Sequence, residues 1–235
     1  MQKAMREETM RLRRLWWAGV EVDCATVQLV IDPLSDARGV VKLGLGAPRT
    51  PTPEPLPGTA HLVLITHLHP DHYLPDHLRA TNAPVFTVVD LADKIRDEAP
   101  DVAERVTVVA PGEEFDPGLP VTAVGEWHNV IHPELPRPYN CGYLVTVADQ
   151  RVYHPGDALT EPGVPVDVLL CPSSAPWLRS EMAIDFVRAV GAPRNLAIHD
   201  RIYTDVAHEI LQTQMDALVG PGGQEWLRIP DGTDF

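Results

Sequence analysis

Three imidazoles and one carboxylate stand close together in residues 67–72, which read His-Leu-His-Pro-Asp-His. The apolar run at 62–65 precedes them and predicts a buried strand, so the cluster lies where a strand ends and a loop opens. His67 and His69 are two residues apart, and an extended backbone points such side chains to one side. Nitrogen and oxygen ligands at this spacing predict a metal site, most typically for zinc, with manganese or iron as alternatives.

The second half of this cluster is expected to face away from the first. Pro70 restricts His69 to an extended conformation and prevents a helix from reaching back over it. Asp71 and His72 then begin a turn. One short loop therefore offers two sets of ligands, as two adjacent metal ions would require. The chain has 10 histidines, and a cluster with this spacing directly after a strand would rarely arise by chance.

The pattern His-x-His-x-Asp-His resembles the first metal motif of the metallo-β-lactamase superfamily. Later segments resemble the remaining motifs in order, each at the end of a predicted strand, and they are 121–128, 151–157 and 195–200. The resemblance implies an α/β fold, a four-layer αββα sandwich with a two-metal centre at one edge. It extends from about residue 10 to the C-terminus. We therefore predict an N-terminal tail at 1–9 and a single hydrolase domain of this fold at 10–235.

The resemblance also implies which residues bind the two divalent metal ions. The first metal would be held by His67, His69 and His128. The second metal would be held by Asp71, His72 and His199. Asp157 would bridge both ions. The two aspartates of this set could also relay protons, which would make Asp71 and Asp157 catalytic.

Some assignments have rivals. His132 lies four residues after His128 and could replace it as the third ligand, but His128 is preferred because it directly follows the strand. Asp200 could accept a hydrogen bond from a ligand imidazole or could cap the next segment, and both interpretations stay open. His154 is expected to pack in its strand or to line the rim. The remaining histidines are interpreted as ordinary surface or core residues, and they are His61, His77 and His208.

The ligands determine the expected chemistry. Two cations roughly 3.5–4 Å apart bind a water and lower its pKa from about 15.7 towards 7. We therefore expect a hydrolase that uses a two-metal-bound hydroxide to cleave a small ester, lactone or phosphodiester. The alternative is a metal-binding oxidoreductase or a non-enzymatic member of the same fold. The sequence contains neither a Gly-x-Ser-x-Gly elbow nor a glycine-rich phosphate loop.

The motifs narrow the substrate only in part. True β-lactamases of the superfamily usually lack the bridging aspartate, so Asp157 favours ester, thioester, lactone or phosphodiester cleavage. The Gly-Asp pair and the late Ile-His-Asp resemble the branch of ascorbate-6-phosphate lactonase-like proteins. The chain departs from that branch at 17–20, which lacks a histidine after the glycine, and at 156–158, where Gly-Asp-Ala replaces Gly-Asp-Thr. Candidate pocket residues near predicted strand ends are Trp127, His132, Arg137, Tyr139, Trp177 and Arg201.

Composition indicates a small-molecule substrate as the partner. The net charge is −14, with 19 basic against 33 acidic residues, which argues against nucleic acid because a phosphate backbone requires clustered Lys and Arg. No apolar run approaches the roughly 18–20 residues that span a bilayer, so no membrane partner is expected. Residues 1–14 lack the apolar region of a signal peptide. Cys24, Cys141 and Cys171 are then interpreted as reduced thiols in a cytoplasmic protein. The oligomeric state stays open.

The elements that must position these residues can be read from apolar patterning. A first strand is expected over 13–22, and a second over 26–33 that closes with Ile-Asp-Pro, as in many members of the superfamily. Residues 141–147 and 151–153 predict a hairpin that turns through Asp149-Gln150. Further strands are expected at 83–89, 106–109, 166–170 and 196–198. The proline-rich segment 46–58 is an irregular loop, either a lid or a plain connection.

Helices are expected near 91–98, from a Ser180 cap to Gly191, and over 205–218. The last of these helices should turn its apolar residues inward, and they are Val206, Ile210, Met215 and Ala217.

Overall fold

The computed structural model of the protein describes residues 10–24, 27–33 and 62–235. The predicted N-terminal tail at 1–9, the proline-rich segment at 46–58 and His61 lie outside these residues. The prediction of one domain over 10–235 stays a prediction.

The first sheet of the described chain has the strand order β1-β2-β3-β4-β5-β6. Its strands are β1 (Arg11–Arg14), β2 (Val20–Asp23), β3 (Gln28–Ile31), β4 (Leu62–Leu64), β5 (Val85–Thr87) and β6 (Val106–Val108). Strands β1 to β3 pair antiparallel, and β3 to β6 pair parallel. The helices between its later strands are α2 (Pro75–Arg79), α3 (Val89–Glu98) and α4 (Pro100–Ala103).

The second sheet has the order β13-β12-β11-β10-β9-β8-β7. Its strands are β7 (Glu114–Phe115), β8 (Val121–Val124), β9 (Gly142–Val147), β10 (Gln150–His154), β11 (Val168–Pro172), β12 (Arg194–Ile198) and β13 (Glu225–Leu227). Strands β7 to β10 pair antiparallel, and β10 to β13 pair parallel. The helical elements of this half are α5 (Ser180–Val190), α6 (Asp205–Leu218) and the 3₁₀ turn η1 (Gly220–Gly222).

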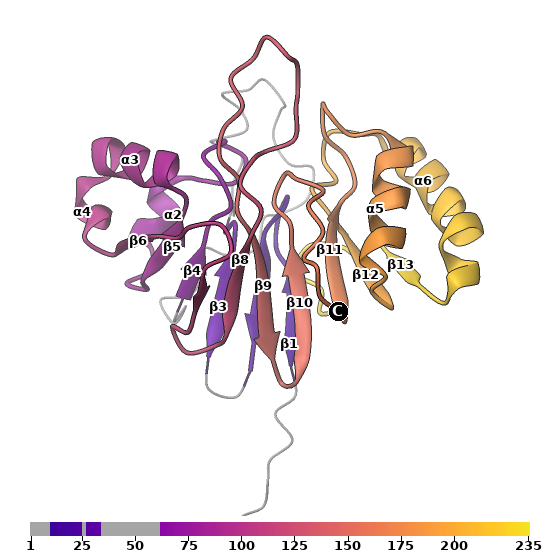
Figure 1. Ribbon diagram of the computed structural model, residues 1–235, viewed down its shortest axis with the longest axis horizontal. Coiled ribbons are helices and arrows are strands. Elements are labelled where there is room, and N and C mark those ends of the chain that lie inside the picture. Colours follow the sequence, from indigo (N-terminus) through magenta and orange to yellow (C-terminus); the bar gives the residue numbers. More distant parts are fainter. Residues whose placement is uncertain (1–9, 25–26, 34–61) are drawn as a thin grey trace, which may run out of the picture.

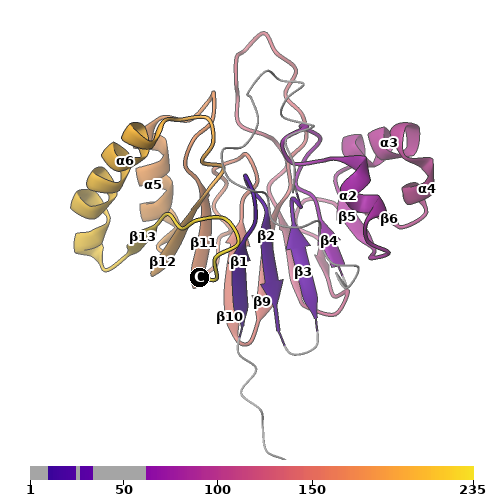
Figure 2. The ribbon, with the colours of Figure 1, turned by 180° about the vertical axis from the view of Figure 1, so that it is seen from behind.

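The two sheets stack at the centre of the molecule, and the helices lie outside them. Helices α2 to α4 lie on one outer side beside β4 to β6, and α5 and α6 lie on the opposite side beside β12 and β13 (Figures 1 and 2). This arrangement confirms the predicted α/β class and its four-layer αββα sandwich.

Consecutive residues of β11 point to opposite faces of the second sheet. Val168 and Leu170 pack in the cluster between the two sheets, whereas Leu169 and Cys171 pack in a second cluster with apolar residues of α5 and α6. Because both faces of the sheet are covered, a strand in this position needs apolar residues throughout. The same requirement explains the apolar run that precedes the histidine cluster in the first sheet, where β4 is fully buried.

Two turns differ from the predictions. The single first strand expected over 13–22 is wrong, because Trp17 adopts a φ of 62° and breaks it into β1 and β2. The backbone N–H of Leu15 donates to the carbonyl of Gly19 at 2.8 Å and closes this turn. The hairpin of β9 and β10 is confirmed, but it turns through Ala148 and Asp149, whose φ values are 47° and 59°. Two left-handed residues suit the twist of a tight hairpin.

The later helices have their predicted bounds, but their ends and faces differ in detail. Helix α5 ends at Gly191, whose φ of 72° suits glycine, whereas Arg179 and not Ser180 occupies the N-cap position. Helix α6 turns Met215 inward as predicted. Its other inward residues are His208 and Leu211.

The predicted inward positions of Val206, Ile210 and Ala217 are wrong, since the side chains of Val206 and Ile210 are 64% and 53% exposed and Ala217 is also exposed. Among the helices of the described ranges, none is both long and apolar enough to cross a lipid bilayer.

Candidate metal centre

The histidine and aspartate motifs follow strands that end at a common edge. Strands β8, β10 and β12 run in one direction, because β9 is antiparallel to β8 and β10 while β11 is parallel to β10 and β12. Their carboxyl ends lead to His128, Asp157 and His199 respectively. In the stacked first sheet, β4 leads to the loop at 67–72. The four motifs therefore meet although up to 132 residues separate them (199 − 67).

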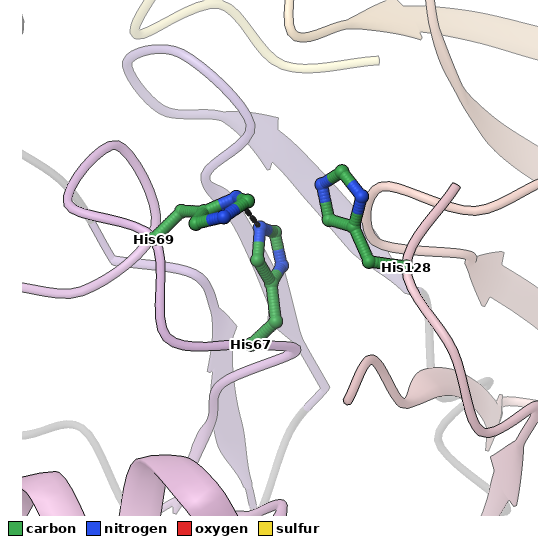
Figure 3. Close-up of side chains that lie close together, drawn as sticks. All are labelled: His67, His69 and His128. Carbon is green, nitrogen blue, oxygen red and sulfur yellow. Dashed lines mark hydrogen bonds between the residues drawn. The ribbon is translucent and has the colours of Figure 1, made fainter. Parts of the chain in front are cut away.

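One group of ligand-type side chains consists of His67, His69 and His128. One ring nitrogen of each lies within 4.8 Å of one from each of the others, and Figure 3 shows the three rings gathered around a common space. His67 Nε2 and His69 Nδ1 are 3.1 Å apart. The ring centroid of His128 lies 5.0 Å from that of His67 and 4.7 Å from that of His69.

A second group consists of Asp71, His72 and His199, whose ligand atoms also lie within 4.8 Å of one another. His199 Nε2 lies 3.2 Å from Asp71 Oδ2. His199 directly follows β12 and adopts a φ of 52°, and its backbone N–H donates to the carbonyl of Trp17 at 3.0 Å. The strained backbone is thus held by the turn between β1 and β2.

Asp157 lies between the two groups. Its Oδ1 is 3.3 Å from His72 Nε2, and its Oδ2 is 3.4 Å from Nε2 of both His128 and His199. The Oδ1 of Asn140 accepts a hydrogen bond from the Asp157 backbone N–H at 3.0 Å. Trp177 Nε1 donates to Asp157 Oδ2 at 3.2 Å. This carboxylate is therefore positioned so that it can contact ions in both groups.

Four buried atoms at the centre have no hydrogen-bond partner among the described residues. They are the Nε2 atoms of His72, His128 and His199 and the Oδ1 of Asp157. Buried polar atoms are nearly always hydrogen-bonded, because an unpaired one costs about 1–3 kcal/mol. Imidazole nitrogens and carboxylate oxygens that converge in this way fit divalent cations such as zinc.

The other ring nitrogens of these histidines are anchored, which turns the unpaired ones toward the centre. His72 Nδ1 bonds Asp32 Oδ2 at 2.7 Å, and His199 Nδ1 donates to the carbonyl of Ser174. His128 Nδ1 donates to the carbonyl of Asn129. Partners of this kind fix the tautomer and orientation of metal-binding histidines.

Asp32 is a site residue that the sequence analysis did not single out. It is fully buried, and besides His72 it accepts hydrogen bonds from the backbone N–H and hydroxyl of Thr66 at 2.8 and 2.7 Å. It thereby ties the end of β3 to the start of the histidine loop. The Ile-Asp-Pro close of the predicted second strand was the signal that could have identified it.

Burial lowers the pKa of some of these histidines, whereas nearby carboxylates raise the pKa of others. Burial lowers the pKa of His67 and brings the pKa of His69 to about 4, so both rings are neutral and can bind a cation. Burial would also lower the pKa of His72, but Asp32 and Asp157 outweigh it and raise that pKa. The pKa of His199 is raised in the same way, against burial, by Asp157 and Asp71.

The pKa of Asp157 is shifted by its interactions with the same histidines. Burial would raise its pKa, but His199 and His72 outweigh burial and hold the pKa well below its usual value. Asp157 is therefore charged at neutral pH.

His132 lies apart from both groups. It is exposed, and its Nδ1 accepts a hydrogen bond from the backbone N–H of Glu134 at 3.2 Å. The other histidines of the described chain that lie outside both groups are buried, and each bonds a backbone carbonyl. His154 Nε2 bonds Ala18 O at 2.8 Å, His77 Nδ1 bonds Pro33 O at 2.6 Å, and His208 Nε2 bonds Asp200 O at 2.9 Å.

Asp200 takes neither of its predicted roles. Its Oδ1 accepts a hydrogen bond from Arg14 of β1, and its Oδ2 accepts one from Arg228 at 2.6 Å. The imidazole beside it is oriented by Ser174 instead, and the N-cap of α6 is Thr204. Both interpretations of Asp200 were wrong because they considered only its sequence neighbours.

A cavity of about 310 Å³ opens onto the candidate metal centre. Trp177 lines it, as predicted for a pocket residue. The other predicted pocket residues are engaged elsewhere. Trp127 stacks on Tyr139 with ring centroids 4.6 Å apart, Arg137 donates to the carbonyl of His128, and Arg201 pairs with Asp231.

Comparison with known proteins supports a family assignment. The model of a family described as a beta-lactamase superfamily domain matches residues 19–199, which include every ligand-type residue of both groups. Protein Rv0786c of Mycobacterium tuberculosis is 39% identical over 154 residues, which cover 63% of this chain and 70% of that protein.

One further relative and one solved structure are described as metal-dependent or metallo hydrolases. The UPF0173 metal-dependent hydrolase PH1671 of Pyrococcus horikoshii is 30% identical over 121 residues, which are 47% of this chain and 53% of that protein. The match thus spans about half the length of this archaeal relative. The solved structure of Igni18, a metallo hydrolase from Ignicoccus hospitalis, superimposes with a TM-score of 0.70 at 17% identity and covers 96% of this chain and 97% of that one.

Proposed function

The chain belongs to the metallo-β-lactamase superfamily, and on this premise we propose that it is a metal-dependent hydrolase with a two-metal centre. The gathering of ligand-type atoms within 4.8 Å of one another, four of them buried without a hydrogen-bond partner among the described residues, carries the proposal. The first ion would be held by His67, His69 and His128. The second ion would be held by Asp71, His72 and His199, and Asp157 would contact both.

Divalent cations bound at these residues would supply a Lewis acid and a nucleophilic hydroxide at neutral pH. The remaining tasks fall to the side chains. Asn140 and Trp177 hold Asp157 between the two groups. Burial would raise the pKa of Asp71, but His199 and His72 outweigh it and lower that pKa. Asp71 is therefore charged at the edge of the cavity, where it can accept a proton from an incoming water.

The proposed substrates are small esters, lactones and phosphodiesters. A cavity of about 310 Å³ lies at the lower end of the size range of ligand pockets, which supports a small molecule as the partner. The net charge of −14 disfavours nucleic acid. A cytoplasmic location is part of the same proposal. Burial raises the pKa of the Cys141 thiol to about 12, so this thiol stays protonated and reacts slowly with oxidants.

Metal removal and reconstitution test this function. Protein stripped with a chelator and reloaded with zinc, manganese or iron should regain hydrolysis of a chromogenic ester, a lactone or bis(4-nitrophenyl) phosphate. Asp157→Asn should fold normally but turn over orders of magnitude more slowly, because a neutral amide is a poor partner for two cations. Asp185→Asn, an exposed change on α5, is the control. Hydrolysis that is indifferent to chelation, or full activity in Asp157→Asn, would overturn the proposal.

A further inference from the structure

The cavity at the candidate metal centre has two kinds of lining. Half of its lining residues are the ligand-type side chains already described. The other half is apolar and consists of Pro70, Ile131, Pro176, Trp177 and Ile202. None of the described residues that line it is Lys or Arg. The described part of the lining therefore offers apolar contact, and no Lys or Arg, to the part of a substrate that does not react.

Two arginines lie near the site, and neither is among the described residues that line the cavity. Arg137 donates through its Nε to the carbonyl of His128, and Arg201 is paired with Asp231 and lies 3.5 Å from Asp200. A phosphate or carboxylate pressed against the apolar walls would lose its hydration without gaining a cationic partner. Burial of an unpaired charge is strongly unfavourable, so such a substrate should bind poorly.

We propose that the substrate is an uncharged ester or lactone whose apolar acyl portion lies against Ile131, Trp177 and Ile202. This inference rests on the proposed hydrolase function and narrows it, because it disfavours substrates that carry a charge away from the reacting bond, such as phosphorylated lactones. Hydrolysis adds one water across the acyl C–O bond and yields a carboxylic acid and an alcohol, so no other reactant is needed. Each methylene that becomes buried should contribute about 0.8 kcal/mol, which corresponds to roughly a fourfold gain.

Matched substrates test the inference on the metal-loaded protein. For 4-nitrophenyl esters, kcat/KM should rise about fourfold per added methylene from acetate to butyrate. The 5-methylhexanoate ester should exceed the mono-4-nitrophenyl ester of glutarate at least tenfold, since in the latter a carboxylate replaces the isopropyl end. Calorimetry should show the same chain-length trend for binding of neutral alkyl ketones, which are not hydrolysed.

A variant at the cavity wall provides a second test of the inference. Ile131→Lys should lower the preference for the neutral ester over the glutarate ester at least tenfold, because it adds a cation to the lining. Ile131 is 39% exposed, so the lysine should be accommodated. Val130→Lys is the matched control, since Val130 is 51% exposed on the same loop and does not line the cavity.

The outcomes separate this inference from the function on which it rests. Equal or better hydrolysis of the glutarate ester, or an unchanged preference in Ile131→Lys, would overturn the inference while the protein remains a hydrolase. Failure of the metal-loaded protein to cleave any ester, lactone or phosphodiester would overturn the proposed function itself, and the inference with it.

Discussion

At the scale of single residues, the third histidine of the first group has a rival four positions away. His128 is buried and stands against His67 and His69, whereas His132 is exposed. His128→Ala should therefore remove at least one metal ion per chain and nearly abolish turnover. His132→Ala is the matched control and should keep the metal content. The metal content of the two purified variants checks this, and loss of metal only in His132→Ala would reverse the assignment.

The raised pKa values of His72 and His199 have a consequence for metal binding. In the metal-free protein both rings retain a proton to a higher pH than an ordinary histidine, because carboxylates stabilise the charged form. A cation can bind only the neutral ring and must displace that proton. Metal affinity should thus weaken as the pH falls through these raised pKa values, and binding at neutral pH should release protons.

Calorimetric titration with zinc in buffers of different ionisation enthalpy measures this release. We expect the apparent binding enthalpy to change with the buffer. A binding enthalpy that is the same in all buffers at neutral pH would contradict the account.

At the scale of elements, the loop after β10 brings Asp157 to the centre through a very close approach. Gly156 has a φ of +65°, and a Cβ there would lie 2.3 Å from Asn140 Oδ1 and 2.8 Å from Thr66 Cβ. Gly156→Ala should therefore displace the loop and lower both stability and metal content. Gly163→Ala is the matched control, because Gly163 has a φ of +72° but open space around it.

The two glycine variants share a backbone strain of about 1–2 kcal/mol, so the difference between them reports the clash. Urea unfolding and metal content of both variants provide the measurement. Equal stability and equal metal content in the two variants would show that the close packing of Gly156 against Asn140 and Thr66 does not position Asp157.

Strand ends could be predicted from sequence, whereas contacts between distant elements could not. The seven ligand-type residues were assigned from the resemblance to the superfamily motifs, and each lies in the histidine loop or within four residues of the end of a strand. Asn140 and Ser174 orient Asp157 and His199 through contacts with residues distant in sequence, which no local pattern reveals. Asp32 had a local signal in the Ile-Asp-Pro close of its strand, but its partners Thr66 and His72 are also distant in sequence. The predicted inward face of α6 was wrong for a similar reason, because His208 and Leu211 occupy the buried face of the helix and the apolar Val206 and Ile210 are exposed.

At the scale of the whole molecule, the C-terminal segment joins the first sheet beside the candidate metal centre. The backbone N–H of Phe235 donates to Leu12 of β1 at 2.7 Å, and that of Gly232 donates to Arg14 at 2.7 Å. Arg14 is buried and pairs with Asp200, the residue after His199, and lies 3.5 Å from Asp231. This network connects both ends of the described chain to the last ligand-type residue.

Arg14→Met should therefore be destabilising, by roughly 1.5–3 kcal/mol, because Asp200 and Asp231 lose a buried cationic partner and keep only Arg228 and Arg201. Arg13→Met is the matched control on the same strand. Arg13 pairs with the exposed Asp234, so little change is expected. Urea unfolding compares the two, and similar stabilities would mean that the buried network does not hold the C-terminal segment in place.

The central claim is that seven side chains from four strand ends hold two metal ions. Elemental analysis of protein reconstituted with zinc and freed of excess metal tests it most directly. The account predicts close to two zinc ions per chain and close to none after exhaustive chelation. Fewer than one ion per chain after careful reconstitution of folded protein would contradict it.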